Sequence, residues 1–197
     1  MLKIGITGNI GSGKTTVSKV FEVLGIPVFY ADDAAKKVMV TDEVLINGIR
    51  SAFGQQSYFD DGTLDRKYIA AIVFNNDAEL NKLNALVHPA VFRAFESWAQ
   101  NYKAKPYILK EAALLFESGS YKLCDYTVMV KASFETRVKR VMLRDALSFT
   151  EIERREAHQF PEEKKASLAD YMINNDGTEL VIPQVLALHK MFLSFGH

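Results

Sequence analysis

A glycine-rich segment, residues 8–15 (Gly-Asn-Ile-Gly-Ser-Gly-Lys-Thr), constrains the fold of this chain more than any other feature. The stretch before it, Leu2–Thr7, is short and apolar like a buried strand, and residues 15–24 carry apolar side chains at helical spacing. The glycines permit positive φ angles and a backbone that closely approaches an anion. This strand, loop and helix match the phosphate-binding loop pattern at every fixed position. The segment therefore predicts an α/β nucleotide-binding core.

Phosphate chemistry assigns a role to each residue at the end of this segment. Backbone N–H groups of residues 11–16 would form an anion-binding nest at a helix N-terminus. Lys14 would bring a full positive charge to the β- and γ-phosphates, and the Thr15 hydroxyl would be a ligand of Mg²⁺. The predicted nucleotide-binding residues here are Gly11, Ser12, Gly13, Lys14, Thr15 and Thr16.

Five short apolar stretches are predicted strands, and helical patterns lie between most of them. The stretches are Leu2–Thr7, 26–30, Tyr107–Glu111, 126–130 and Tyr171–Asn174. This alternation predicts a P-loop NTPase fold, with a five-stranded, mostly parallel sheet flanked by helices. The last helix should begin at Pro183, because the first turn of a helix has no use for the missing N–H.

Two intervals between strands are too long to be simple crossovers. Residues 31–106 contain several helical patterns, and about 146–170 are highly charged with few large apolar side chains. We expect a nucleotide-binding core of residues 1–31, 106–145 and 171–197, a helical acceptor-binding insertion over 32–105, and a mobile lid over 146–170. Within the insertion, Pro89 should end or kink a helix just before it.

The charge balance and the cysteine content limit the partners and the compartment that we expect for the protein. Its 24 basic and 24 acidic residues cancel, so we expect neither nucleic acid nor a membrane as a partner. The single cysteine, Cys124, fits a reducing compartment, and every apolar run is too short to span a bilayer. We expect a cytoplasmic protein, and no obligate protein partner is evident.

Absent signatures narrow the class of nucleotide-binding protein. A GTPase would need a guanine-reading Asn-Lys-x-Asp motif, and residues 81–84 (Asn-Lys-Leu-Asn) lack its last aspartate. The Asp-x-x-Gly motif usual in GTPases and the Ser-Gly-Gly-Gln signature of ABC-type ATPases do not occur either. A compact core with two insertions favours an ATP-dependent kinase, which must enclose donor and acceptor away from water. Asp32 follows the second predicted strand and is a candidate general base, although Asp32 or its neighbour Asp33 could serve only as a helix cap.

Three arginines recur at helical spacing after the fourth predicted strand. Arg137, Arg140 and Arg144 would share one face of a helix that runs into the charged lid. A guanidinium binds two phosphate oxygens at once, so these residues could neutralise the charge of a transferring phosphoryl group. The alternative is a solvated basic stripe.

Several segments, taken in order, resemble the dephospho-CoA kinase family over nearly the whole chain. They are residues 4–14, 31–32, 61–66, 83–89, 114–117 and 140–145, followed by Arg155, Gln159, Pro161, Lys165 and residues 169–170 and 175–177. The resemblance implies ATP-dependent phosphorylation of the ribose 3′-hydroxyl of dephospho-CoA, giving coenzyme A and ADP.

The resemblance also implies roles for single residues. Asp32 would be the general base, while Arg140 and Arg144 would face the phosphates. Arg155 would close from the lid, and Asn175 would lie near the adenine.

Two further residues receive implied roles. Glu111 stands where the family tends to have Asp and could hold a Mg²⁺-bound water. His88 could face the substrate or could simply bond a carbonyl at a helix end. Tyr30 and Ala113 depart from the Asp and Pro that are usual in the family.

Two other functions stay open at this point. One is a kinase for another small acceptor, such as a nucleoside monophosphate. The other is a non-catalytic nucleotide-binding module, against which Lys14, Thr15 and Asp32 argue because a pure binder needs no base.

Overall fold

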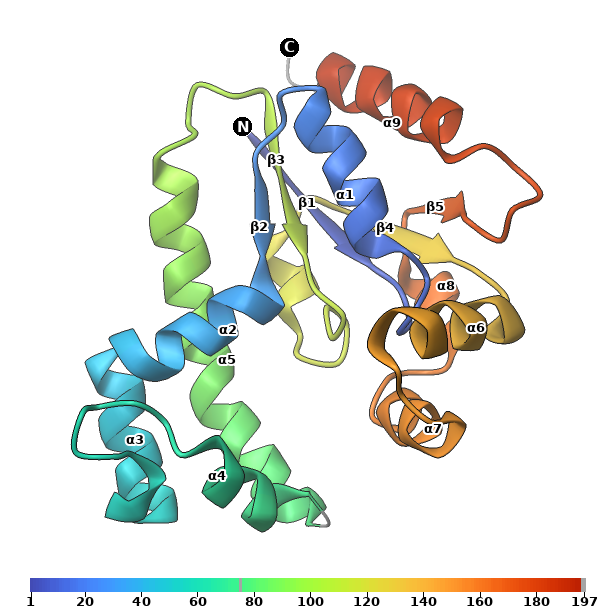
Figure 1. Cartoon of the computed structure of the whole chain (residues 1–197). Helices are drawn as coiled ribbons and strands as arrows, with labels where there is room; N and C mark the ends of the chain where they lie inside the picture. The colour runs from blue at the N-terminus through green and yellow to red at the C-terminus, as the bar shows by residue number, and fades with distance from the viewer. Residues whose placement is uncertain (75, 196–197) are drawn as a thin grey trace. The chain divides into compact units, whose positions relative to one another are not determined.

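The computed structural model describes residues 1–74 and 76–195, which divide into two compact units (Figure 1). Unit 1 joins Met1–Tyr30 to the chain from Asn101 onward, and unit 2 is Ala31–Gln100. Unit 1 contains the sheet and the glycine-rich loop, whereas unit 2 is built of helices. Within the described ranges, no helix is long and apolar enough to cross a lipid bilayer.

The sheet of unit 1 has five parallel strands in the order β2-β3-β1-β4-β5. The strands are β1 Leu2–Thr7, β2 Val28–Tyr30, β3 Tyr107–Glu111, β4 Tyr126–Lys131 and β5 Tyr171–Asn174. The predicted five-stranded parallel sheet is thereby confirmed. Glu111, the last residue of β3, lies in register with Tyr30 on one side and Ile6 on the other. The end of β3 is thus next to the point where β1 runs into the loop.

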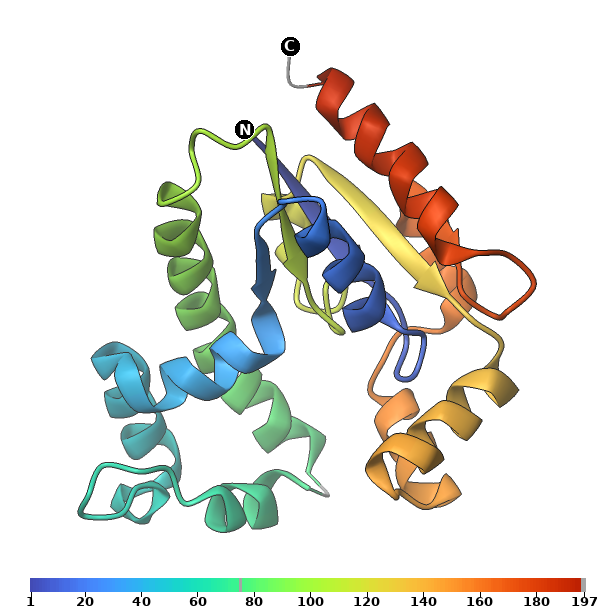
Figure 2. The ribbon, with the colours of Figure 1, turned by 45° about the horizontal axis from the view of Figure 1, so that its top comes forward.

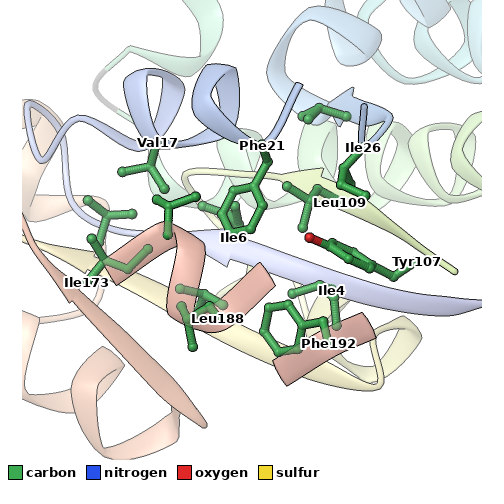
Figure 3. Packing of buried hydrophobic residues seen from close by; sticks show 14 residues of the cluster. Ile4, Ile6, Val17, Phe21, Ile26, Tyr107, Leu109, Ile173, Leu188 and Phe192 are labelled. Atoms are coloured by element: carbon green, nitrogen blue, oxygen red, sulfur yellow. The ribbon is translucent and has the colours of Figure 1, made fainter. Parts of the chain in front are cut away.

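Helices α1 (Lys14–Val23) and α9 (Val181–Phe195) pack apolar side chains against the sheet. The helices of unit 1 are α1 Lys14–Val23, α6 Phe134–Asp145, α7 Phe149–Ala157, α8 Glu162–Leu168 and α9 Val181–Phe195, with a 3-10 turn η2 at Ser120–Leu123. Phe21 of α1 and Phe192 of α9 both pack against Tyr107 of β3, with ring centroids 6.4 and 5.5 Å apart (Figure 3). A Cβ on Gly5 would lie 2.7 Å from Leu115 Cδ2, so the segment after β3 covers the opposite face.

The last helix starts at Val181, two residues before the predicted start at Pro183. Pro183 therefore lies in the first turn, where its missing N–H has no intrahelical acceptor in any case. Gln184 fixes this start, because its side chain accepts the Asn174 N–H at 2.8 Å and donates to the Asn174 carbonyl at 2.9 Å.

Unit 2 contains α2 Ala31–Thr41, α3 Glu43–Phe53, η1 Gln55–Ser57, α4 Arg66–Val73 and α5 Asp77–Gln100. The expected helix end before Pro89 is wrong, since α5 continues through this residue. A proline inside a helix costs about 3 kcal/mol. Val87, Val91 and Phe95, on both sides of it, are buried, and burial of one large apolar side chain contributes about 1.5–3 kcal/mol. Packing on both sides therefore outweighs the local defect.

Candidate active site

The loop between β1 and α1 has a backbone that only glycine supports at key positions. Gly11 has a φ of 80°, and a Cβ there would meet the carbonyl oxygen of Arg137 in α6 at 2.5 Å. Gly13 has a φ of 91° and is the N-cap residue of α1, so no side chain caps the N–H groups of the first turn. The N–H groups of a first helical turn have no intrahelical acceptor and can therefore bind an anion. The geometry suits the predicted binding of phosphates.

The side chain of Lys14 bonds to the loop with which it would bind phosphate. Its Nζ donates to the Gly8 carbonyl at 2.9 Å and to the Asn9 carbonyl at 3.5 Å, and the residue is buried. These carbonyls hold the ammonium group close to the nest. The group can exchange them for phosphate oxygens with a rotation of its flexible stem.

Thr15 and Glu111, the two predicted metal-site residues, contact each other. The Thr15 hydroxyl donates to Glu111 Oε1 at 3.1 Å, and Glu111 is buried at the end of β3. The described residues contain no group of three or more His, Cys, Asp or Glu side chains that could hold a metal ion. A hydroxyl and a carboxylate beside a phosphate nest do fit Mg²⁺, because this ion keeps waters and phosphate oxygens as most of its ligands.

Asn175, the residue after β5, contacts the same loop. Its Nδ2 donates to the Ser12 carbonyl at 2.8 Å, and its backbone N–H donates to the Lys131 carbonyl at 2.8 Å. A Cβ on Gly13 would overlap the Asn175 side chain, so the absence of a side chain at Gly13 allows this approach. Asn175 is therefore placed beside the nucleotide loop, and its proposed contact with adenine stays a prediction.

The three arginines predicted to share one phosphate-facing surface differ in their surroundings. Arg137 is buried and bonded to protein atoms on all sides, with both Nη atoms on Glu156 at 2.7 and 2.8 Å. Its inclusion in a phosphate-binding stripe is wrong, because its guanidinium is already satisfied within the protein. Arg140 keeps a buried Nη1 that makes no hydrogen bond to any described residue. That atom retains the capacity to bind an anion.

Arg144 and Arg155 are exposed on α6 and α7. Arg144 bonds Asp145 through two nitrogens at 2.8 Å, and this pairing raises the pKa of Arg144 above its ordinary value and lowers that of Asp145. The charge of Arg155 lowers the pKa of Asp145 further. Both guanidinium groups are accessible, and their binding of phosphates stays a prediction.

Asp32 and His88 belong to unit 2. Asp32 lies in the first turn of α2, two residues after the end of β2, and its neighbour Asp33 pairs with Lys36 at 2.7 Å. His88 lies inside α5 and stacks on Phe92, with ring centroids 6.5 Å apart. The alternative of a helix-end role for His88 is wrong, because α5 extends to Gln100. Their roles as base and substrate contact stay predictions.

Residues with no assigned role connect the lid segment, residues 146–170, to the loop. Asn9 Nδ2 donates to Glu156 Oε1 at 2.9 Å, and Figure 2 shows α6 and α7 beside the loop that precedes α1. Lys165 is fully buried, with Nζ 2.8 Å from the Ala113 carbonyl and 3.0 Å from Glu117 Oε1. Burial lowers the pKa of Lys165, and the Glu117 carboxylate opposes this shift. Charged segments are usually solvated, so the residue pattern did not predict the burial of Lys165 or the contacts of Glu156, and the family resemblance indicated Lys165 without a role.

Comparison with known proteins places the chain in one family. The family model described as Dephospho-CoA kinase matches residues 2–180. A Bacteroides fragilis protein named Dephospho-CoA kinase is 38% identical over 187 residues, which cover 95% of this chain and 91% of that protein. Two solved structures share the fold over nearly the full length of both chains. A Thermus thermophilus protein has a TM-score of 0.82 at 34% identity, covering 98% of this chain and 97% of that one.

The second structure is a dephospho-CoA kinase from Campylobacter jejuni. It has a TM-score of 0.71 at 25% identity and covers 99% of this chain and 98% of its own. These matches extend through the loop, the helical unit and the lid segment alike. The chain therefore belongs to the dephospho-CoA kinase family.

Proposed function

We propose that this protein transfers the γ-phosphoryl group of ATP to the ribose 3′-hydroxyl of dephospho-CoA, producing coenzyme A and ADP. The observation that carries the proposal is a complete phosphate-binding loop, residues 8–15, inside a match to this family over residues 2–180. The loop supports the use of a nucleoside triphosphate as donor. Family membership supports the choice of acceptor.

The donor side of the reaction would use residues of unit 1. The nest of N–H groups and the α1 N-terminus would hold the β- and γ-phosphates, and Lys14 would leave its loop carbonyls for phosphate oxygens. Thr15 and Glu111 would hold Mg²⁺ directly or through a water. When bound, Mg²⁺ neutralises part of the phosphate charge.

The transfer itself needs one proton acceptor. The 3′-oxygen forms a bond to the γ-phosphorus, the bond from that phosphorus to the bridging oxygen breaks, and ADP leaves with the electron pair. We assign the proton of the 3′-hydroxyl to the Asp32 carboxylate. Asp32 suits this role because it lies two residues after the carboxyl end of β2, and α/β enzymes bind ligands at the carboxyl ends of their strands.

The predicted cationic side chains would neutralise the negative charge of the transferring phosphoryl group. Arg140 and Arg144 from α6 and Arg155 from the lid segment would bind the transferring phosphoryl group. Arg140 is the strongest of the three candidates, because its buried Nη1 makes no hydrogen bond to any residue within the described ranges. Asn175 would contact the adenine and His88 the acceptor.

We further expect a cytoplasmic protein, because the sequence contains a single cysteine, Cys124, as suits a reducing compartment. The acceptor-binding role of the helical insertion and the closing motion of the lid belong to the same proposal. Both are supported by the need of a kinase to exclude water from its reacting groups.

An acceptor panel in one ADP-release assay tests the proposed reaction. We expect ADP to form with ATP, Mg²⁺ and dephospho-CoA, and not with nucleoside monophosphates or with ATP alone. Comparable turnover on monophosphates would instead support a nucleotide kinase. Tight ATP binding without turnover on any acceptor would support a non-catalytic binding module.

The general base has its own test and a matched control. Asp32→Asn keeps the shape of the side chain and removes the proton acceptor, so the rate should fall by about 10²–10⁴-fold. Asp33→Asn changes the adjacent carboxylate, which is exposed and paired with Lys36, and should leave the rate nearly unchanged. Near-normal turnover of Asp32→Asn would remove Asp32 from this role.

A further inference from the structure

Two consecutive peptide groups of the phosphate-binding loop are held by side chains from distant parts of unit 1. The Ile10 N–H donates to Gln159 Oε1 at 2.8 Å, and the Ile10 carbonyl accepts from Arg137 Nη1 at 3.2 Å. Gln159 follows α7 in the lid segment, and Arg137 lies in α6. Both polar groups of one loop residue are therefore bonded outside the loop.

The planarity of the peptide bond converts these contacts into an orientation of the loop. In a trans peptide the C=O and the N–H point in opposite directions. Because the Ile10 carbonyl points to Arg137, the N–H of Gly11 in the same peptide points the other way, toward the concave side that would receive phosphate. Because the Ile10 N–H points to Gln159, the Asn9 carbonyl points inward. There it accepts from the Ser12 N–H at 3.0 Å and from Lys14 Nζ at 3.5 Å.

Arg137 is itself fixed in place. Its side chain is 4% exposed, its Nε donates to the Ala132 carbonyl at 3.0 Å, and Glu156 accepts from both Nη atoms. Glu156 also accepts from Asn9 Nδ2 at 2.9 Å. The guanidinium thus has no freedom to follow a turning Ile10 carbonyl, and the loop peptide is held against a rigid partner.

We propose that Gln159 and Arg137 are positioning residues for the ATP site, which orient the peptide groups at 9–10 and 10–11 so that the Gly11 N–H and Lys14 face the phosphates. The inference rests on the proposed use of this loop for ATP. Neither side chain needs to touch the nucleotide. Their effect is to keep the nest pre-formed, so that binding does not have to reorient the backbone.

A pair of substitutions at Gln159 tests the proposal. Gln159→Met keeps the length of the side chain and removes the acceptor, so the Kd for a non-hydrolysable ATP analogue should rise about tenfold in calorimetry. Gln159→Glu retains an acceptor oxygen and should restore most of the affinity. Glu153→Gln, an exposed change on the same lid segment, is the matched control and should bind the analogue like the unaltered protein.

A change in KM for ATP without a change in KM for dephospho-CoA distinguishes a positioning role from general structural damage. Gln159→Met should raise KM for ATP while KM for dephospho-CoA, kcat at saturating ATP and the melting temperature change little. Unaltered ATP affinity in Gln159→Met would overturn the proposal, and so would an equal rise in both KM values with a large drop in melting temperature. If the unaltered protein binds ATP but does not phosphorylate dephospho-CoA, the proposed function fails while the calorimetry still tests the positioning role.

Arg137→Lys provides an independent variant. A single ammonium can keep the charge interaction with Glu156 but cannot reach that carboxylate, the Ala132 carbonyl and the Ile10 carbonyl together. We expect weaker analogue binding than in the unaltered protein even when the measurement is made far below the melting temperature of the variant. Analogue affinity equal to that of the unaltered protein would contradict the assignment of Arg137.

Discussion

Replacement of Lys165 should reveal how firmly the lid segment is attached to the core. Lys165 is fully buried in α8, where its ammonium group lies 3.0 Å from Glu117 Oε1 and 2.8 Å from the Ala113 carbonyl. Lys165→Met fills the same space without the charge. It leaves the Glu117 carboxylate, whose side chain is 12% exposed, with the N–H of Phe160 at 2.7 Å as its remaining donor.

The expected magnitude follows from the uncompensated carboxylate. Removal of one partner of a buried ion pair costs about 3–5 kcal/mol. With a urea dependence of about 2 kcal/mol per molar, a loss of 3 kcal/mol lowers the unfolding midpoint by about 1.5 M. Urea unfolding followed by circular dichroism measures this shift. The double variant Lys165→Met with Glu117→Gln removes both charges and keeps an acceptor for Phe160, so it should regain most of the lost stability.

The neighbouring Lys164 provides the matched control for the Lys165→Met variants. It is exposed and lies over the ring of Phe160, with Nζ 3.4 Å from the ring centroid. Lys164→Met should cost no more than about 1 kcal/mol. The reasoning would be refuted by a Lys165→Met variant as stable as Lys164→Met, or by a double variant less stable than Lys165→Met alone.

Three further outcomes follow from the structure. Gly11→Ala should lower ATP-analogue affinity by more than about tenfold in calorimetry, because it combines a positive φ with a blocked Cβ, whereas Gly62→Ala, with a φ of 82° and no atom within 4 Å of a Cβ, should bind normally. Thr15→Val should raise the Mg²⁺ concentration for half-maximal activity about tenfold, since it removes the hydroxyl beside Glu111. Because the pKa of Lys165 is lowered from 10.5 in the folded state, the unfolded chain binds more protons in the window just below 10.5. Stability measured by urea unfolding should therefore rise with pH in that window, and this rise should be absent in Lys165→Met.

The features that sequence reasoning found are those encoded over short distances. The loop needs glycines, a lysine and a threonine within eight adjacent positions, and each strand is a short apolar run. Local chemistry decides these features, so five parallel strands and the helix after the loop could be predicted. The loop also contacts Glu111, at the end of β3, and Asn175, just after β5, and these two residues were indicated only by resemblance to a family.

The features that were missed depend on tertiary contacts. Arg137 and Arg140 are three residues apart on one helix, yet Arg137 is buried because Glu156 meets it from the lid segment. The sequence around Arg137 does not predict its contact with Glu156. Lys165 lies in a charged stretch and is buried because Glu117, far away in the sequence, neutralises it. The helix through Pro89 persists because buried neighbours on both sides outweigh a local penalty.

The strand order also governs when the nucleotide site can form during synthesis. Among the residues that the structure describes, β1, which leads into the loop, pairs with β3 and β4 alone, and these strands begin at Tyr107 and Tyr126. The N-terminal strand therefore leaves the ribosome about a hundred residues before either neighbour exists, a long-range pairing of the kind that slows folding. The helices of Ala31–Gln100 are synthesised in this interval and make their contacts mostly with one another. A nascent chain should consequently acquire protection by ATP only after β4 has emerged, although its phosphate-binding loop is made well before that strand.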